Sequence, residues 1–168
     1  MIERKYLAHY LDTAFSSSKP AYERLGKDLE EYREDLNPDV EIKKNILGEN
    51  SVHVNGYEPQ SDVDPYYNDY ADTLSERLEK IGNERLTGDE LKTTKIDALF
   101  KKDGTCVWAY REDIVIVVNS IGGDTSGVQT PFTIYNAGNR VKGTFDPETM
   151  TFTELTDKVT ELTDTDED

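Results

Sequence analysis

The loop Gly123–Gly127 holds the sequence that comes nearest to a catalytic motif. It reads Gly-Asp-Thr-Ser-Gly, and aspartic proteases carry a similar Asp-Thr-Gly around each of their two catalytic carboxylates. Here an extra residue separates Asp124 from Gly127, and a second copy of the motif is missing. Because that chemistry needs two carboxylates that share one proton, the sequence predicts a glycine-rich turn loop instead.

A second group of oxygen-bearing side chains has the residue types that bind calcium. It consists of Asp62, Asp64, Asn68 and Asp69. An EF-hand loop needs a glycine at its sixth position and an acid at its twelfth. Counted from Asp62, those positions hold Tyr67 and Thr73. The pattern therefore predicts a solvated loop and not a calcium site.

The chain has one cysteine, Cys106, and two histidines, His9 and His53. One cysteine excludes an internal disulfide and a multi-thiolate metal site, and two histidines leave little for zinc or a hydrolytic triad. Cys106 stands beside Val107 and Trp108, which predicts a buried structural thiol. His9 lies in an apolar segment and is expected to be packed, whereas His53 lies in a polar hairpin and is expected to be exposed.

Motifs for phosphate binding and for a serine nucleophile are also missing from the sequence. We therefore expect no catalytic residues, no cofactor and no metal, and the chain is not predicted to be an enzyme. The formal net charge is −16 at pH 7. Nucleic-acid binding draws its affinity from Lys and Arg that displace counterions from phosphates. Such a charge excludes an ordinary DNA-binding module, but not a surface along which DNA slides without adhering.

Composition predicts one domain followed by an acidic end. The chain has 168 residues, of which 35% are hydrophobic and 32% charged, so its core must be modest. We expect a domain over residues 1–155 and a disordered tail over 156–168, since the segment Glu154–Asp168 has seven acids and one lysine. No apolar run is long enough to span a bilayer, and the first residues lack a signal-peptide pattern, which indicates synthesis in a cytosol.

Residues 69–85 form the most strongly predicted helix. Asn68 or Asp69 can cap its start, and Gly88 follows its end. Its apolar residues recur at helical spacing; they are Tyr70, Leu74, Leu78 and Ile81.

The second half of the chain alternates between polar and apolar residues in a way that is typical of strands. A polar loop is expected over 120–127 and a turn over Asn136–Asn139. The two segments within 106–118 could also form one long strand with a bend at 111–113. The predicted strands are 93–101, 106–110, 114–118, 129–135, 140–145 and 150–155. The fold class is therefore mainly β with one α-helix.

Two segments of the first half need separate consideration. In residues 22–36 the apolar residues Leu25, Leu29, Tyr32 and Leu36 have helical spacing. Tyr22, Arg24 and the break at Gly26 also suit a strand. The pattern alone favours a helix there. Residues 40–57 predict a long hairpin, because a turn at 48–50 separates two alternating segments. That hairpin has too few apolar residues to cover a core, so we expect it to project and to need a partner.

Seven short blocks occur in order between about Arg4 and Phe152. They are Tyr22–Tyr32, Asn37–Glu41, Lys44–Glu49, Gly56–Pro59, Trp108–Asp113, Gly122–Gly127 and Asn139–Phe145. Each block is weak alone, but the ordered set resembles the major tail tube proteins of long-tailed, siphovirus-like bacteriophages and prophages of Gram-positive bacteria. The acidic segment beyond Leu155 lies outside the resemblance.

This resemblance implies a β-sandwich or barrel-like fold with a flanking helix at about 69–85 and a projecting hairpin at about 40–57. In that family six subunits form a ring, inner strands of the ring join into a continuous barrel, and rings stack into a hollow tail tube. The resemblance also implies that Leu25–Leu36 is a strand. By position, the hairpin is the element that reaches the neighbouring ring. Its candidate stacking residues are Val40, Ile42, Ile46, Val52, Val54 and Tyr57.

The resemblance also implies a set of partners and a location. The partners are further copies of the chain, a tape-measure protein that sets tail length, a tail terminator, and tail tip or baseplate proteins. DNA would pass through the lumen during ejection without specific binding, and no membrane is involved. The implied location is the virion tail, assembled in the host cytoplasm.

Two other classes of protein fit the same sequence. One is a different structural virion protein, such as a tail terminator or head–tail connector, which would form single rings. The other is an acidic β-sandwich binding module of adhesin or carbohydrate-binding type. That module would be a monomer and would use Tyr66 and Tyr67 in a surface cleft.

Overall fold

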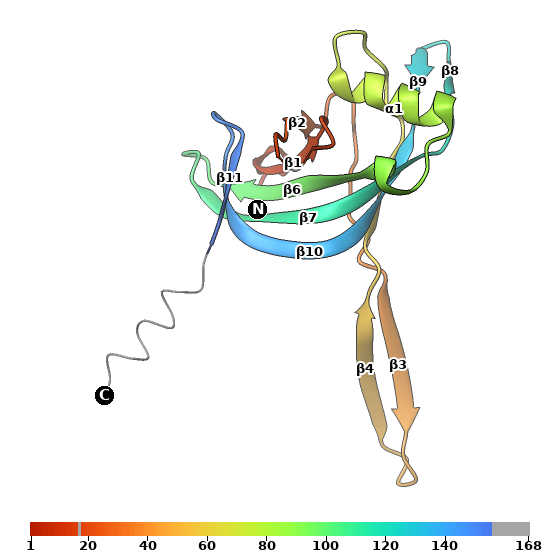
Figure 1. Ribbon diagram of the computed structural model, residues 1–168. Coiled ribbons are helices and arrows are strands. Elements are labelled where there is room, and N and C mark those ends of the chain that lie inside the picture. The colour runs from red at the N-terminus through yellow and green to blue at the C-terminus, as the bar shows by residue number, and fades with distance from the viewer. Residues whose placement is uncertain (17, 156–168) are drawn as a thin grey trace.

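The computed structural model describes residues 1–16 and 18–155. Within them one seven-stranded antiparallel sheet has the order β11-β10-β7-β6-β1-β2, with β5 also paired to β10. The sheet curls into a half-barrel (Figure 1). Its strands are β1 (Leu7–Asp12), β2 (Tyr22–Leu25), β5 (Gln60–Val63), β6 (Lys92–Phe100), β7 (Cys106–Val118), β10 (Phe132–Asp146) and β11 (Thr151–Glu154).

In the part of the chain that the structure describes, two separate hairpins and three helical segments complete the fold. The hairpin β3–β4 points away from the sheet, whereas β8–β9 lies near α1 (Figure 1). Their bounds are β3 (Pro38–Lys44), β4 (Asn50–Tyr57), β8 (Gly122–Asp124), β9 (Gly127–Gln129), α1 (Thr73–Glu84) and the 3₁₀ turns η1 (Arg4–Tyr6) and η2 (Gly88–Leu91). The predicted class, mainly β with one α-helix, is confirmed. Of the two forms that the resemblance implied, the curled sheet is the barrel-like one.

Apolar residues pack on both faces of the sheet. On one face Leu74 and Leu78 of α1 pack with Ile114, Ile116 and Phe132, all of them buried. The opposite face holds a smaller cluster, made of Ala8, Tyr10, Ile96, Ala98, Ala109 and Phe145. A sheet that buries side chains on both faces is a rigid support for anything attached to it.

Helix α1 begins at Thr73, four residues later than the predicted start at residue 69. Neither Asn68 nor Asp69 is its N-cap. The cap is Asp72, whose carboxylate accepts a hydrogen bond of 3.0 Å from the Leu74 amide and also contacts the Tyr66 hydroxyl. The segment before it is occupied by a turn, because the Asp69 carboxylate accepts from the Ala71 amide.

Replacing Asp72 with alanine is expected to lower the free energy of unfolding by about 1–2 kcal/mol, because the cap is lost and the buried Tyr66 hydroxyl loses an acceptor. Urea denaturation measures this difference. Lys80→Ala, on the exposed side of the same helix, is the control and should stay within about 0.5 kcal/mol of the wild type. Equal effects of the two substitutions would contradict the capping role.

Two predicted elements are wrong. Leu25–Leu36 is neither helix nor strand: β2 ends at Leu25, and residues 26–36 run over the sheet as an irregular strap with one bridge at Asp35. The turn predicted at Asn136–Asn139 is absent, because β10 continues through it with two register shifts, and Gly138 has a positive φ of 100°. Of the two readings of residues 106–118, the single long strand is the observed one.

The predicted polar loop at 120–127 contains β8 and the start of β9. A Cβ at Gly123 would fall 2.0 Å from the Gly127 carbonyl oxygen, so only glycine fits there. The predicted disorder of residues 156–168, and with it the tail boundary, lies outside the described residues.

Candidate assembly interface

The hairpin β3–β4 forms a separate two-stranded sheet that extends from the body (Figure 1). Val40 pairs with Val54 and Ile42 with Val52, so these four side chains lie on one face, because residues directly opposite each other in a ladder share a face. Glu41 pairs with His53 on the opposite, polar face. We call Val40, Ile42, Val52 and Val54 the apolar stripe.

All six candidate stacking residues are exposed. In the stripe, Ile42 is 67% and Val52 65% exposed, which is unusual for aliphatic side chains in the middle of a strand. Ile46 lies at the hairpin tip and Tyr57 at its base, so the structure brings together four of the six residues and places the other two at the ends. Contiguous apolar surface of this kind marks a protein interface or an aggregation hazard.

The tip of the hairpin is shaped by one asparagine. The Asn45 side-chain oxygen accepts hydrogen bonds of 2.9 Å from the amides of both Leu47 and Glu49. Gly48 takes the positive φ of 79° that the turn requires. Ile46 and Leu47 consequently point outward, and both are largely exposed.

The base of the hairpin is fastened by backbone bonds between its two legs, residues 32–37 and 58–63. The Asp35 amide donates to the Gln60 carbonyl at 2.8 Å, and the Gln60 amide donates to the Asp35 carbonyl at 3.0 Å. The Asn37 side chain donates to the Glu58 carbonyl at 3.0 Å. Beside these bonds is a hollow of about 270 Å³, lined by Leu36, Tyr57, Pro59, Glu34, Glu112 and Arg140.

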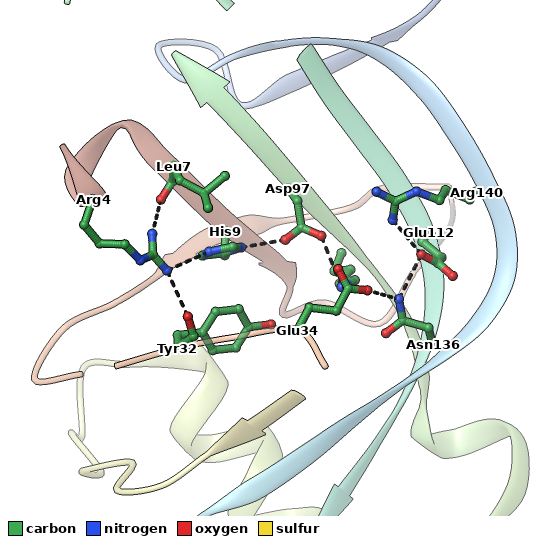
Figure 2. Close-up of polar contacts among 10 residues, drawn as sticks. Arg4, Leu7, His9, Tyr32, Glu34, Asp97, Glu112, Asn136 and Arg140 are labelled. Atoms are coloured by element: carbon green, nitrogen blue, oxygen red, sulfur yellow. Dashed lines mark hydrogen bonds and ion pairs between the residues drawn. The ribbon is translucent and has the colours of Figure 1, made fainter. Parts of the chain in front are cut away.

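A buried charge network lies under the first leg (Figure 2). The Lys95 ammonium is 3.1 Å from a Glu34 oxygen and 3.1 Å from an Asp97 oxygen, as ion pairs whose angles fall outside hydrogen-bond geometry. The Lys95 side chain is only 2% exposed. A buried ammonium is stable only when carboxylates surround it, so each member of this network depends on the others.

The network continues toward the N-terminus through His9. Arg4 contacts His9 Nε2 at 2.9 Å, and His9 Nδ1 lies 2.6 Å from Asp97. Because a guanidinium only donates, Nε2 accepts, and the Nδ1 proton is donated to Asp97. Arg4 also donates to the Tyr32 carbonyl at 3.3 Å, so the same chain of contacts reaches the strap.

On the other side the network ends at β7 and β10. The Asn136 side-chain amide donates to Glu34 and, at 2.9 Å, to Glu112. Glu112 also accepts from Arg140 at 2.8 Å, and the Arg140 guanidinium lies 4.4 Å from the centre of the Tyr110 ring. The network thus spans four adjacent strands and contains three cations and three carboxylates, namely Arg4, Lys95, Arg140, Glu34, Asp97 and Glu112.

The pKa values of Lys95 and Asp97 follow from their surroundings. Burial opposes the charged form of Lys95, but the Asp97 carboxylate, the Tyr32 hydroxyl once it is ionised and the Glu34 carboxylate together outweigh burial and raise the Lys95 pKa. Burial likewise opposes the charged form of Asp97, but the hydrogen bond from His9 and the charge of Lys95 lower the Asp97 pKa. Burial raises the pKa of Tyr32 to about 12. At neutral pH Lys95 and Asp97 are therefore both ionised.

The loops that resembled catalytic or metal sites have local structural roles. The Asp124 carboxylate accepts from the Ser126 amide at 2.8 Å, and the Asp62 carboxylate accepts from the Thr133 hydroxyl at 2.8 Å. Within residues 1–16 and 18–155, no cluster of three His, Cys, Asp or Glu side chains has a geometry that would hold a metal. Over the same residues no helix has the length and apolar character needed to cross a bilayer.

The burial of the histidines, the cysteine and Tyr66 can be compared with the sequence predictions. His9 is packed, with its ring centre 4.4 Å from that of Tyr32, and His53 is exposed; both predictions are confirmed. Cys106 is half-buried against the smaller cluster. Tyr66 is 7% exposed and packs on Phe132, so it does not lie in the surface cleft that a binding module would need.

The fold is similar to that of a chain in an extracellular contractile injection system. No family model and no curated protein matches the sequence. A chain in the extended PVC sheath–tube complex, an extracellular contractile injection system, matches with a TM-score of 0.50 at 9% identity, over 86% of this chain and 92% of that one.

Two chains from the anti-feeding prophage match with lower TM-scores. One, from its tube-terminating cap, has a TM-score of 0.48 at 12% identity and covers 86% of this chain and 91% of that one. The other, from its baseplate, has a TM-score of 0.39 at 8% identity and covers 81% and 89%. At these identities the PVC likeness establishes the fold class alone. Membership of the family in long-tailed phages of Gram-positive bacteria stays a prediction.

Proposed function

We propose that this chain is a structural subunit of a phage-type tail tube, in which six copies form a ring and rings stack into a hollow tube. The observation that carries the proposal is the hairpin β3–β4, whose apolar stripe projects from the body with side chains that are 49–67% exposed. A free subunit has nothing to cover that stripe among its described residues. A neighbouring ring would cover it, and the fold, shared with a chain of a sheath–tube complex, supports this reading.

The open edges of the sheet support ring formation. Strand β2 pairs only with β1, and β11 only with β10, within the described residues. Unpaired edges invite strand addition by other copies unless they are protected. Closing the half-barrels of several subunits around a common axis would use both edges and limit uncontrolled aggregation.

The charge of the chain fits a conduit for DNA. With a net charge of −16, an acidic lumen would offer DNA no gain from counterion release, so DNA would slide without adhering. In this proposal the further partners are a tape-measure protein, a tail terminator and tail tip proteins, and the location is the virion tail. A head-to-tail stack does not limit its own length, which is why such partners are needed.

Negative-stain electron microscopy of the concentrated protein, with size-exclusion chromatography alongside, tests the proposal. We expect hollow tubes or stacked rings with six-fold end views. Single rings that never stack would replace the proposal with a terminator or connector role. A protein that stays monomeric at every concentration would contradict self-assembly.

A further inference from the structure

We propose that the Glu34 carboxylate is a positioning group that fixes the direction in which the hairpin β3–β4 leaves the body. Its importance for stacking rests on the proposed function, but its control of the hairpin direction does not. The inference starts from the position of Glu34: it belongs to the first leg of the hairpin, three residues before Asn37, yet its side chain points back into the sheet (Figure 2).

Glu34 ties the first leg to two strands of the sheet. One of its oxygens lies 3.1 Å from the Lys95 ammonium on β6, and the same oxygen accepts a hydrogen bond from the Asn136 side chain on β10. The Glu34 side chain is 19% exposed, so water competes weakly for these contacts. Its neighbours on the strap, Glu31 and Arg33, instead form a pair on the surface.

Asn136 joins this contact to the second leg. Its backbone amide donates to the Pro59 carbonyl at 3.1 Å, while its side chain donates to Glu34 and Glu112. One residue of β10 therefore holds both legs, at a point where β10 shifts register. Register shifts redirect side chains and bend strands, which is consistent with a specific attachment point for the hairpin at Asn136. We call this attachment point the junction.

Geometry explains why such a junction matters. A strand of seven residues is about 24 Å long, so a rotation of about 15° at its base moves the far end by about 6 Å. This displacement is close to two residues of strand rise, enough to misalign the apolar stripe with any fixed partner surface. The contacts described between hairpin and body lie at its base, so the base sets the direction of the whole element.

An ion pair suits this task better than apolar packing would. Buried pairs add little net stability, but they demand one arrangement of their partners, and that property has been linked to structural specificity in some proteins. Glu34 satisfies Lys95 and Asn136 together only when the strap lies in its observed place. We infer that the pair defines the hairpin angle rather than the stability of the hairpin ladder.

Distance measurements between spin labels test this directly. In a Cys106→Ser background, spin labels are attached at Glu49→Cys on the hairpin tip and at Asp103→Cys on the body. Pulsed electron paramagnetic resonance measures the distance between them, which reports the hairpin direction. The protein is kept dilute, so that tube formation plays no part. We expect Glu34→Ala to broaden the distance distribution at least twofold. Glu31→Ala, which removes an exposed acid from the same strap, should leave it unchanged.

Two further readouts separate positioning from a general loss of structure. Near-ultraviolet circular dichroism must show that the labelled variants are folded. Glu34→Gln keeps the side-chain shape and an oxygen that can accept from Asn136, so this variant is used if Glu34→Ala does not fold. It should broaden the distribution of spin-label distances about 1.5-fold. A folded Glu34→Ala or Glu34→Gln protein with the narrow distribution of the wild type would overturn the inference.

Tube assembly provides a second test. If the wild type forms tubes, Glu34→Ala should raise the concentration needed for tube formation at least tenfold, and Glu31→Ala should not. If the wild type forms no tubes, the proposed function fails, but the spin-label distances still decide whether Glu34 fixes the hairpin.

Discussion

Ile42→Asp is expected to abolish tube formation while leaving the thermal unfolding midpoint of the subunit unchanged. Ile42 is 67% exposed in the subunit, so its replacement removes little packing from the body. In a stacked tube the new carboxylate would be buried against apolar side chains, and the burial of an isoleucine, about 1.5–3 kcal/mol, would be lost. In the proposed ring, each of the six copies would repeat the effect. Electron microscopy and sedimentation measure assembly, and differential scanning calorimetry measures the midpoint.

Lys43→Asp is the matched control for this experiment. It adds a carboxylate one residue further along the same strand, on the polar face of the hairpin that carries Glu41 and His53. We expect tubes to form, because the apolar stripe stays intact. Glycine or aspartate at Val54 should act like Ile42→Asp, since Val54 belongs to the same stripe. Normal tubes from Ile42→Asp and from the Val54 variants would show that the hairpin is not the stacking element.

The hairpin and the strands of the second half could be predicted because their signals are local. Alternation in residues 93–101 is enough to indicate a strand, and β6 is found there, at Lys92–Phe100. The low apolar content of residues 40–57 indicates projection for the same reason: a segment that cannot cover a core does not lie on one. These conclusions need no knowledge of distant contacts.

The strap at residues 26–36 could not be predicted, because its structure depends on distant strands. Leu29 and Tyr32 do turn inward, as a helical pattern requires, but they pack on the main core from an irregular chain, whereas Leu25 packs there from the end of β2. Positive φ values at Gly26 and Asp28 break any regular element there. The same reason applies to Asn136–Asn139, where pairing with β7 carries β10 through a segment that has turn composition.

The charge network was also invisible in the sequence. Lys95 and Asp97 alternate with Ile96 and Ala98, which is the usual pattern of a strand with one wet face. In the structure both charges are buried, because β1 supplies His9 and the strap supplies Glu34 from segments more than sixty residues away. A pair of opposite charges at i and i+2 is the only local signal, and surface strands share it.

Lys95→Met is expected to lower the free energy of unfolding at pH 7 by about 3–5 kcal/mol, although methionine fills a similar volume. The substitution leaves Asp97 and Glu34 buried near one another without their shared cation. Lys80→Met, on the exposed side of α1, is the control and should change the free energy of unfolding by less than about 0.5 kcal/mol. Urea denaturation of the two variants and the wild type gives both values.

The loss in free energy of unfolding caused by Lys95→Met should depend on pH if Lys95 acts through its charge, and not if it acts through packing. We call this loss the deficit. In the wild type Asp97 has a lowered pKa, so its contribution is present above the unfolded pKa of about 3.9 and is lost only as pH falls through the lower folded value. Without Lys95, burial opposes the charged form of Asp97 with less compensation, so protonation of Asp97 as pH falls from 7 to 5 stabilises the folded variant. The deficit should therefore narrow over that range, and Asp97→Asn added to Lys95→Met should recover part of it at pH 7. A deficit that is constant with pH and unaffected by Asp97→Asn would mean that Lys95 acts through packing alone.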